Sequence, residues 1–285
     1  MRGIITKGIG GLYFVKAEDN QIYECKARGI FRKEKIKPMI GDNVLFEYDD
    51  NGAVITEIEP RKNSLIRPSV ANIDTLIAVI SAKNPCPDFL LTDKLLLMAE
   101  IRNIPPVICI TKTDLSSTKE IHDVYKNTGY KIFEVSSKTN TGISELKSIL
   151  KGKTTAFAGL SGVGKSSLLN LLIERNLKTG DISHKINRGK HTTRHVELFD
   201  LDIGGFVLDT PGFSSFEPDT IEENTLSLYY PEMGSYKNSC RFKGCSHINE
   251  PDCAVKDALN NGHISEERYK NYCQIYTTLK NNKKW

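Results

Sequence analysis

The stretch GLSGVGKSS, which begins at Gly159, has the residue types and spacing of a phosphate-binding loop. It stands between a segment that predicts a strand (153–158) and one that predicts a helix (165–175). In such a loop backbone N–H groups face the phosphates, Lys165 reaches the β- and γ-phosphates, and the Ser166 hydroxyl is a Mg²⁺ ligand. A glycine-rich turn before a core helix is the alternative. The predicted contacts are Gly159, Leu160, Ser161, Gly162, Val163, Gly164, Lys165, Ser166 and Ser167.

The sequence DTPG, which ends at Gly212, follows a strand-like run, as the Mg²⁺-sensing aspartate of nucleotide hydrolases does. Asp209 would hold the metal through water, and Gly212 would offer its N–H to the γ-phosphate. The basic, histidine-rich segment 184–199 lies before it. A threonine of such a segment closes over Mg²⁺ when the γ-phosphate is present. Thr192 and Thr193 are both candidates, with Thr193 favoured, and a flexible surface loop is the compatible alternative.

The sequence TKTD, which ends at Asp114, is typical of loops that read guanine. Asp114 would accept hydrogen bonds from guanine N1 and N2, which adenine cannot supply, and Lys112 would lie along the base and reach the phosphate loop. The sequence SSKT, from Ser136, would present backbone N–H groups to guanine O6. Each motif ends a predicted strand, on the rim where open α/β sheets bind ligands. The predicted base contacts are Thr111, Lys112, Thr113, Asp114, Ser136, Ser137 and Lys138.

These loops occur in an unusual order, because the base-reading loops precede the phosphate loop. Joining adjacent termini of a domain and cutting it elsewhere leaves every strand neighbour unchanged, so the order predicts a circularly permuted domain. The segment near 210–216 then leads directly into residues 217–285, and we expect it to pass on a γ-phosphate-dependent movement. Phe213 stands where Ras-like enzymes carry a water-orienting glutamine, which predicts slow intrinsic hydrolysis that a partner stimulates. His191 or His195 could position the water, or could contact phosphate or RNA instead.

A cluster of cysteine and histidine near the C-terminus has metal-ligand spacing. Cys240, Cys245, His247 and Cys253 supply three thiolates and one imidazole, a set typical of structural Zn²⁺ with no open position. Because the region shows little apolar sequence, we expect the metal to supply much of its folding energy. Reduced thiols without metal are the alternative, and His263 is a second-choice imidazole.

The chain divides into three stretches with different patterns. Residues 1–66 alternate with a period of two, most clearly at 12–15, 21–25, 42–48 and 52–59, which predicts a small β-barrel. We favour an OB-fold, whose commonest ligands are oligonucleotides, although an SH3-like barrel has the same pattern. Residues 67–216 alternate strands with helices, which predicts an α/β domain with a parallel sheet. Residues 217–285 predict a small helical, metal-binding domain. One face of its last helix, expected to pack in the core, carries Tyr269, Tyr272, Cys273, Tyr276 and Leu279.

The composition is that of a globular protein, with 39% hydrophobic and 26% charged residues among 285. No apolar run is long enough to cross a bilayer, and the N-terminus lacks a signal-peptide pattern, so we expect a cytoplasmic protein without a membrane partner. No coiled-coil pattern or exposed apolar helix suggests more than a monomer. The net charge of +4 does not by itself indicate nucleic acid. Residues 26–37 carry six basic side chains against Glu34 and could form an RNA-binding strip or a solvated face. Cys25, Cys86 and Cys109 are expected to be buried thiols.

Taken together, TKTD, SSKT, GLSGVGKSS, RGKHTTRH, DTPGF and the cysteine–histidine cluster resemble, in the same order, the circularly permuted GTPases of the RsgA (YjeQ/YloQ) family. The resemblance covers essentially the whole chain. It implies a GTPase that binds GTP and GDP, hydrolyses GTP when stimulated by the small (30S) ribosomal subunit, and acts with its rRNA late in assembly. A hydrophobic residue such as Phe213 belongs to the family pattern. Gly162 replaces an asparagine with which some permuted GTPases recruit K⁺, so no K⁺ requirement is expected.

Two other classes remain open on the residues alone. One is an RNA-binding module in which hydrolysis is incidental. The other is a metabolic nucleotide-dependent enzyme, although the sequence offers no second small-molecule site and leaves a basic barrel unexplained.

Overall fold

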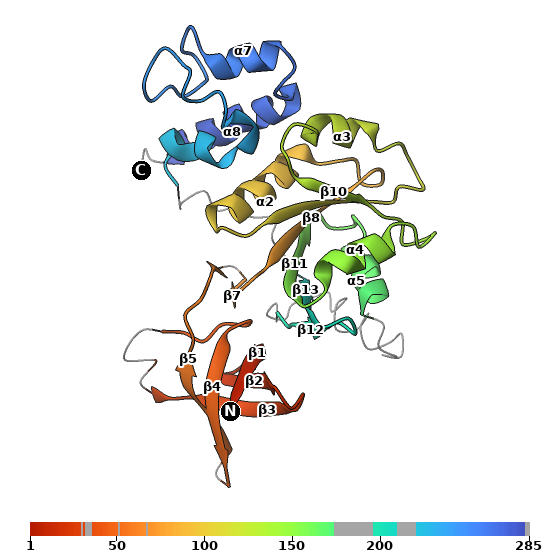
Figure 1. Cartoon of the computed structure of the whole chain (residues 1–285), viewed down its shortest axis with the longest axis vertical. Coiled ribbons are helices and arrows are strands. Elements are labelled where there is room, and N and C mark those ends of the chain that lie inside the picture. The colour runs from red at the N-terminus through yellow and green to blue at the C-terminus, as the bar shows by residue number, and fades with distance from the viewer. Residues whose placement is uncertain are drawn as a thin grey trace.

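The computed structural model describes residues 1–29, 31, 36–50, 52–66, 68–173, 196–209 and 221–282. Three parts follow one another along its longest axis (Figure 1). A β-barrel lies at one end, an α/β sheet with its helices lies in the middle, and a helical region with the C-terminal cysteines lies at the other end. Within the described ranges, no helix combines the length and the apolar character needed to span a membrane.

The N-terminal part is a closed five-stranded barrel with the strand order β1-β2-β3-β5-β4. β3 and β5 pair in parallel and the other neighbours pair antiparallel. Alternate side chains point inward, so that Ile5, Val15, Cys25, Phe46 and Ile55 form a fully buried core. The barrel is therefore an OB-fold rather than the SH3-like alternative. Its strands are β1 (Arg2–Ile9), β2 (Leu12–Ala17), β3 (Ile22–Ala27), β4 (Asn43–Asp49) and β5 (Gly52–Ile58).

The central part is a six-stranded sheet with the order β10-β9-β8-β11-β13-β12, in which only the edge pair β12–β13 is antiparallel. Its strands are β8 (Thr75–Ser81), β9 (Pro106–Thr111), β10 (Lys131–Glu134), β11 (Lys153–Gly159), β12 (Phe199–Asp200) and β13 (Gly205–Asp209). A short hairpin, β6 (Ser64–Leu65) with β7 (Val70–Ala71), leads from the barrel to the sheet.

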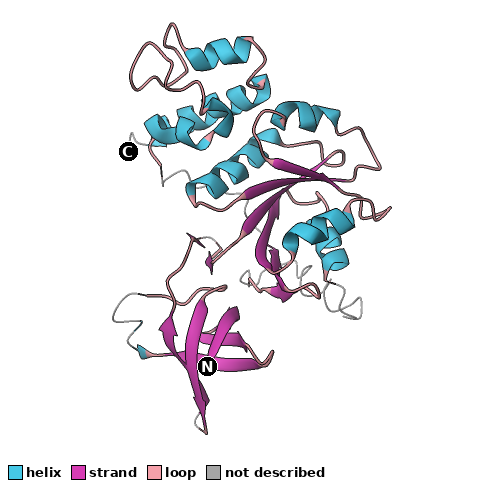
Figure 2. Cartoon of the chain, viewed as in Figure 1, coloured by secondary structure: helices cyan, strands magenta, loops and turns pink. Residues whose placement is uncertain are grey.

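Helices cover both faces of this sheet (Figure 2). α2 (Phe89–Ile101) and α3 (Lys119–Tyr125) pack on one face, and α4 (Ile143–Leu150) and α5 (Lys165–Leu172) pack on the other. Successive residues of β8 alternate between the two cores, with Leu76 in one and Ile77 in the other. All seven residues of β8 are buried, which explains why its sequence is continuously apolar.

The C-terminal part contains η2 (Glu223–Tyr229), η3 (Pro231–Met233), α7 (Ala254–Asn260) and α8 (Glu266–Asn282). The expectation that this part has little apolar core is wrong. Eleven buried residues form one cluster, to which α2 contributes Leu97, so the part completes its core against the central sheet domain. The stripe on α8 packs as predicted, with Tyr272 and Leu279 almost fully buried.

Two of the three scattered cysteines are buried as expected. Cys25 lies in the barrel core and Cys109 lies in the sheet, where burial raises the pKa of each thiol. The prediction for Cys86 is wrong, because this thiol is exposed. The apolar run ends with β8 at Ser81, and Cys86 lies in the loop that leads to α2.

Candidate nucleotide site and metal centre

The predicted phosphate loop connects β11 to α5. At Gly159 the two central strands approach so closely that a Cβ would lie 2.3 Å from the carbonyl oxygen of Val79. Gly164 has a φ of 100° and precedes the first helical residue, Lys165, so a left-handed turn starts the helix. The ammonium of Lys165 donates to the carbonyl oxygens of Gly159 and Leu160, both at 2.9 Å. The loop therefore curls around this ammonium.

The TKTD motif contacts this loop directly. Lys112 is separated by 50 residues from Gly162, yet its ammonium donates to the Gly162 carbonyl oxygen at 2.7 Å and also to that of Asn84. The hydroxyl of Thr111 donates to the carbonyl oxygen of Val163 at 2.5 Å. Lys112 has a φ of 56°, a conformation that is costly for a lysine and concentrates at functional sites. The two motifs thus form one loop cluster at the carboxyl ends of β9 and β11.

The SSKT motif fixes the aspartate of TKTD. The hydroxyl of Ser136 donates to Asp114 Oδ1 at 2.6 Å, and its oxygen accepts the backbone N–H of Lys138 at 3.3 Å and of Thr139 at 3.2 Å. The hydrogen bond from Ser136 is the main reason why the pKa of Asp114 is lowered. Asp114 is exposed, so its ionised carboxylate is both held in position and accessible to a ligand.

Several predicted nucleotide contacts lie outside the described residues. These are His191, Thr192, Thr193, His195, Gly212 and Phe213. Asp209 ends β13, where its backbone is in register with Phe157 of the strand that leads to the phosphate loop. In the basic strip 26–37, Lys26, Arg28 and Lys37 are described, whereas Arg32, Lys33 and Lys35 are not.

The four predicted metal ligands converge. Their ligand atoms all lie within 4.8 Å of one another. The sulfur atoms of Cys240 and Cys253 are 3.8 Å apart, and His247 Nδ1 lies 3.5 Å and 3.4 Å from them. Around a tetrahedral Zn²⁺ at normal bond lengths these separations are about 3.8 Å and about 3.6 Å. The site therefore fits a zinc ion, and the second-choice ligand, His263, is exposed and outside the cluster.

The backbone around the ligands is held by side chains that the sequence analysis did not connect with the metal. The hydroxyl of Tyr269 donates to the carbonyl oxygen of His247 at 2.6 Å, and the hydroxyl of Tyr272 donates to the carbonyl oxygen of Ser246 at 2.8 Å. The carboxylate of Glu250 accepts the N–H of Ser246 at 2.8 Å and that of Ile248 at 3.2 Å. The tyrosine stripe, predicted only as core packing, thus also positions the metal loop.

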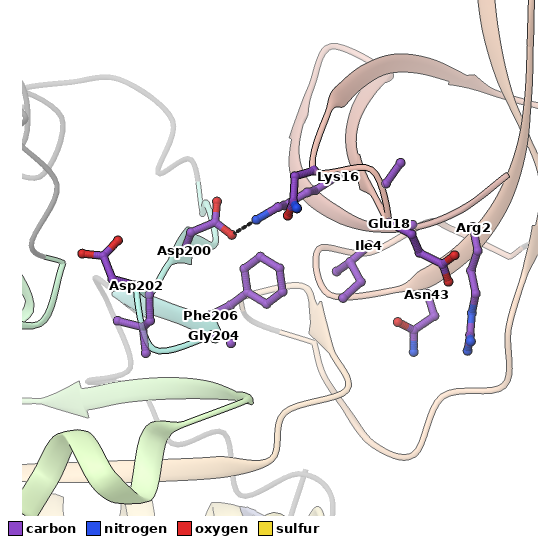
Figure 3. Close-up of a pocket in the computed structure, with 14 residues that line it drawn as sticks. Arg2, Ile4, Lys16, Glu18, Asn43, Asp200, Asp202, Gly204 and Phe206 are labelled. Carbon is purple, nitrogen blue, oxygen red and sulfur yellow. Dashed lines mark hydrogen bonds and ion pairs between the residues drawn. The ribbon is translucent and has the colours of Figure 1, made fainter.

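A cavity of about 700 Å³ lies between the barrel and the edge of the sheet (Figure 3). Lys16 and Asp200 form an ion pair across this junction, and the N–H of Leu198 donates to the carbonyl oxygen of Thr6 at 2.9 Å. The lining mixes acidic and basic groups and contains no residue of the three nucleotide-loop motifs, so the cavity is not part of the predicted nucleotide site.

The fold and the loop cluster define a circularly permuted P-loop GTPase with an OB-fold barrel before it and, after it, a region whose cysteine–histidine cluster could hold a metal ion. Comparison with known proteins agrees. Residues 58–219 match the profile of the RsgA GTPase, and residues 2–55 match that of the RsgA N-terminal domain. The chain belongs to the RsgA GTPase family.

Relatives resemble the chain over nearly its full length. A protein of Ruminiclostridium cellulolyticum named small ribosomal subunit biogenesis GTPase RsgA is 50% identical, covering 98% of this chain and 93% of its own. The Bacillus subtilis protein of the same name is 43% identical, with coverages of 99% and 98%. Among solved structures, YjeQ from Thermotoga maritima is 39% identical with a TM-score of 0.84 and covers 98% of both chains. YloQ, described as a circularly permuted GTPase, is 37% identical with a TM-score of 0.82 and covers 99% of this chain and 95% of its own.

Proposed function

We propose that this GTPase acts in maturation of the small ribosomal subunit, binds its rRNA in the GTP state, and leaves after hydrolysis. The observation that supports the nucleotide site most directly is the contact between Lys112 and Gly162, because it joins the base-reading loop to the phosphate loop. The names of the relatives support the ribosomal task. The barrel of residues 1–66, the GTPase domain of 67–216 and the metal domain of 217–285 would then have separate roles.

Each nucleotide loop has a proposed role. Lys165 binds the β- and γ-phosphates, and Asp114 selects guanine through two hydrogen bonds. Mg²⁺ bound with GTP neutralises charge on these phosphates, and Ser166 and Asp209 would hold it. Thr193 and Gly212 would sense the γ-phosphate. Because the side chain of Phe213 cannot orient water, hydrolysis depends on a partner that completes the site.

Two surfaces suit an RNA partner. On the barrel, a hollow of about 550 Å³ is lined by Tyr13, Lys26, Arg28 and Lys37 beside the turn between β1 and β2. Such turns and strands bind oligonucleotides in OB-folds. At the far end of the molecule, the exposed ring of Phe242 lies between Arg241 and Lys243 in the loop between two metal ligands. Figure 1 shows the GTPase domain between these ends, so one RNA surface could engage both.

The metal is proposed to be one structural zinc ion. Its four ligands are protein side chains, so its contribution is to hold the loop that carries Phe242 in one conformation. We also propose that the protein acts as a monomer in the cytoplasm, where it would meet immature subunits.

The proposal is tested by co-sedimentation with small and with large ribosomal subunits in the presence of GDP or a non-hydrolysable GTP analogue. Single-turnover hydrolysis is measured with and without small subunits. We expect binding to the small subunit alone, tighter with the GTP analogue, together with faster hydrolysis. Asp114→Asn supplied with xanthosine triphosphate is the matched control, since the subunit should stimulate hydrolysis of that nucleotide instead. Equal hydrolysis with and without subunits would favour a simple RNA-binding module.

A further inference from the structure

A fully buried ionic cluster joins the C-terminal part to the GTPase domain. Arg268 of α8 donates to Asp93 of α2 at 2.7 Å, and to the two oxygens of Glu232 at 2.7 and 3.1 Å. The side chains of all three residues are at most 2% exposed. Asp93 accepts two more hydrogen bonds, from Asn271 at 2.7 Å and from Tyr125 at 2.9 Å. The guanidinium also lies 4.6 Å from the centre of the Tyr230 ring.

The geometry of this cluster is directional. The planar fork of Arg268 bridges one carboxylate on the GTPase domain and one on the C-terminal part, and a lysine lacks the two parallel donors that hold both oxygens of Glu232. Burial raises the pKa of Asp93, and the hydrogen bonds it accepts from Arg268 and Asn271 oppose that shift. A buried carboxylate with this set of donors is satisfied in only one relative position of α2 and α8.

α2 is built to receive this contact. Leu90, Asp93, Leu97 and Ile101 follow helical spacing along one face, and the three apolar members pack in the C-terminal core. Leu95, Leu96 and Ala99 pack on the sheet. α2 therefore lies between the two cores, and Asp93 is the carboxylate in an otherwise apolar stripe.

The beginning of α2 lies beside the phosphate loop. Asp88 caps the helix by accepting the N–H of Leu91 at 2.9 Å. The preceding loop contacts the nucleotide motifs, since Asn84 accepts a hydrogen bond from Lys112 and Pro85 lies 3.9 Å from the position of a Cβ on Gly162. Cys86, Asp88 and Leu91 line a small crevice together with Gly159 and Leu160.

We propose that Arg268 is a positioning residue for the nucleotide site. By fixing Asp93, it sets the position of α2 and thereby of the loop 82–88 that supports the phosphate loop. The C-terminal part and the nucleotide are then coupled through α2, independently of the chain segment that joins the two domains. This inference rests on the guanine-nucleotide site proposed above but does not depend on the ribosomal partner.

Coupling of this kind is reciprocal. If the cluster strengthens GDP binding by a given factor, GDP must stabilise the C-terminal part against opening by the same factor. We expect Arg268→Met to raise the Kd for GDP about 10-fold, within the usual range for coupled sites. In the wild-type chain GDP should slow amide hydrogen exchange in α8 by a similar factor, and in Arg268→Met it should not.

The experiment uses the full chain, with a fluorescent GDP analogue for affinity and hydrogen exchange with and without GDP. Lys270→Met is the matched control, because Lys270 lies on the same helix, α8, but forms an exposed ion pair with Glu267. Arg268→Lys keeps the positive charge but lacks the planar fork. Its Kd for GDP should lie between those of wild type and Arg268→Met. If Arg268→Met does not fold, Arg268→Lys is used in its place. α5 at the phosphate loop should be protected by GDP in every variant.

The outcomes separate the two proposals. GDP binding with equal protection of α8 in wild type and in the Arg268 variants would overturn this inference alone. Failure of the wild-type chain to bind GDP would overturn the proposed function as well. A purely structural role would lower thermal stability and leave the Kd and the effect of GDP on α8 unchanged.

Discussion

The hydroxyls of Tyr269 and Tyr272 should control metal affinity although neither is a ligand. Each donates to a carbonyl oxygen of the segment that carries His247, at 2.6 and 2.8 Å. Tyr269→Phe with Tyr272→Phe removes both hydrogen bonds while it preserves the rings, which pack against each other with centroids 6.3 Å apart. All four ligands remain. The double variant therefore changes only the support of the loop that carries the ligands and leaves the ligands themselves unchanged.

The size of the effect follows from the two bonds. An intramolecular hydrogen bond contributes about 1 kcal/mol net, so two that support the liganded loop contribute about 2 kcal/mol. That energy corresponds to a roughly 30-fold weaker Kd for Zn²⁺, within the 10- to 100-fold losses that follow removal of groups orienting metal ligands. Far-UV circular dichroism should change little, because the apolar core of α7 and α8 does not involve these hydroxyls.

Competition with a chromophoric chelator measures the affinity. Tyr276→Phe is the matched control, because Tyr276 belongs to the same stripe and packs on Tyr272 with centroids 6.3 Å apart, whereas the two hydrogen bonds to the metal loop come from Tyr269 and Tyr272. It should bind zinc like the wild type. A double variant whose zinc affinity stayed within about twofold of the control would refute the positioning argument.

Four further outcomes follow from the structure. Asp114→Asn should weaken GDP binding about 100-fold and favour xanthosine diphosphate, measured by competition. The hydrogen bond from Ser136 lowers the pKa of Asp114 below its ordinary 3.8, so the carboxylate loses its charge only as the pH falls through that lowered value. The preference for GDP over ADP, measured by competition so that titration of the shared phosphates cancels, should therefore stay level down to about pH 5. Gly159→Ala should cost about 1–3 kcal/mol in urea denaturation, because its Cβ would meet the Val79 carbonyl oxygen. Phe242→Ala should weaken co-sedimentation with small subunits about 10-fold if the ring stacks on a base.

Sequence patterns predicted the regular elements well, because the two-residue and helical periods directly reflect which face is buried. The four barrel strands from β2 to β5 were visible as alternation. β1 was not singled out, and the structure gives a reason: its pairing with β2 shifts register between Ile5 and Lys7, and such a bulge breaks the alternation. The segment that forms α2 has helical spacing, but the sequence does not show that it is apolar on two faces, one toward the sheet and one toward the C-terminal core.

In the candidate site, too, local sequence features could be predicted and long-range contacts could not. The phosphate loop, TKTD, SSKT and the metal ligands were predictable because each is a short motif whose chemistry is local in sequence. The bonds that position them were not. Asp93 and Arg268 are 175 residues apart, and Tyr272 is 26 residues from the carbonyl that it supports. Only packing brings such pairs together, and their residue types alone suggest an exposed charge or an ordinary core ring. The expectation of a small C-terminal core was wrong because ten of its eleven buried residues lie within residues 226–279, where they are dispersed among polar residues.

Circular permutation gives the Arg268 cluster its significance. The C-terminal part follows the segment after DTPG in the chain, and among the described residues its core packs on α2. The apolar contacts of α2 bring the two cores together but tolerate sliding, because apolar packing has little directional preference. The hydrogen bonds of Arg268 prevent this sliding, because any shift of α8 along α2 would leave a buried carboxylate without its donor. The orientation of the metal loop is thus set from the GTPase side. Removal of the metal should loosen the segment from Cys240 to Cys253 while α8 keeps its place on α2.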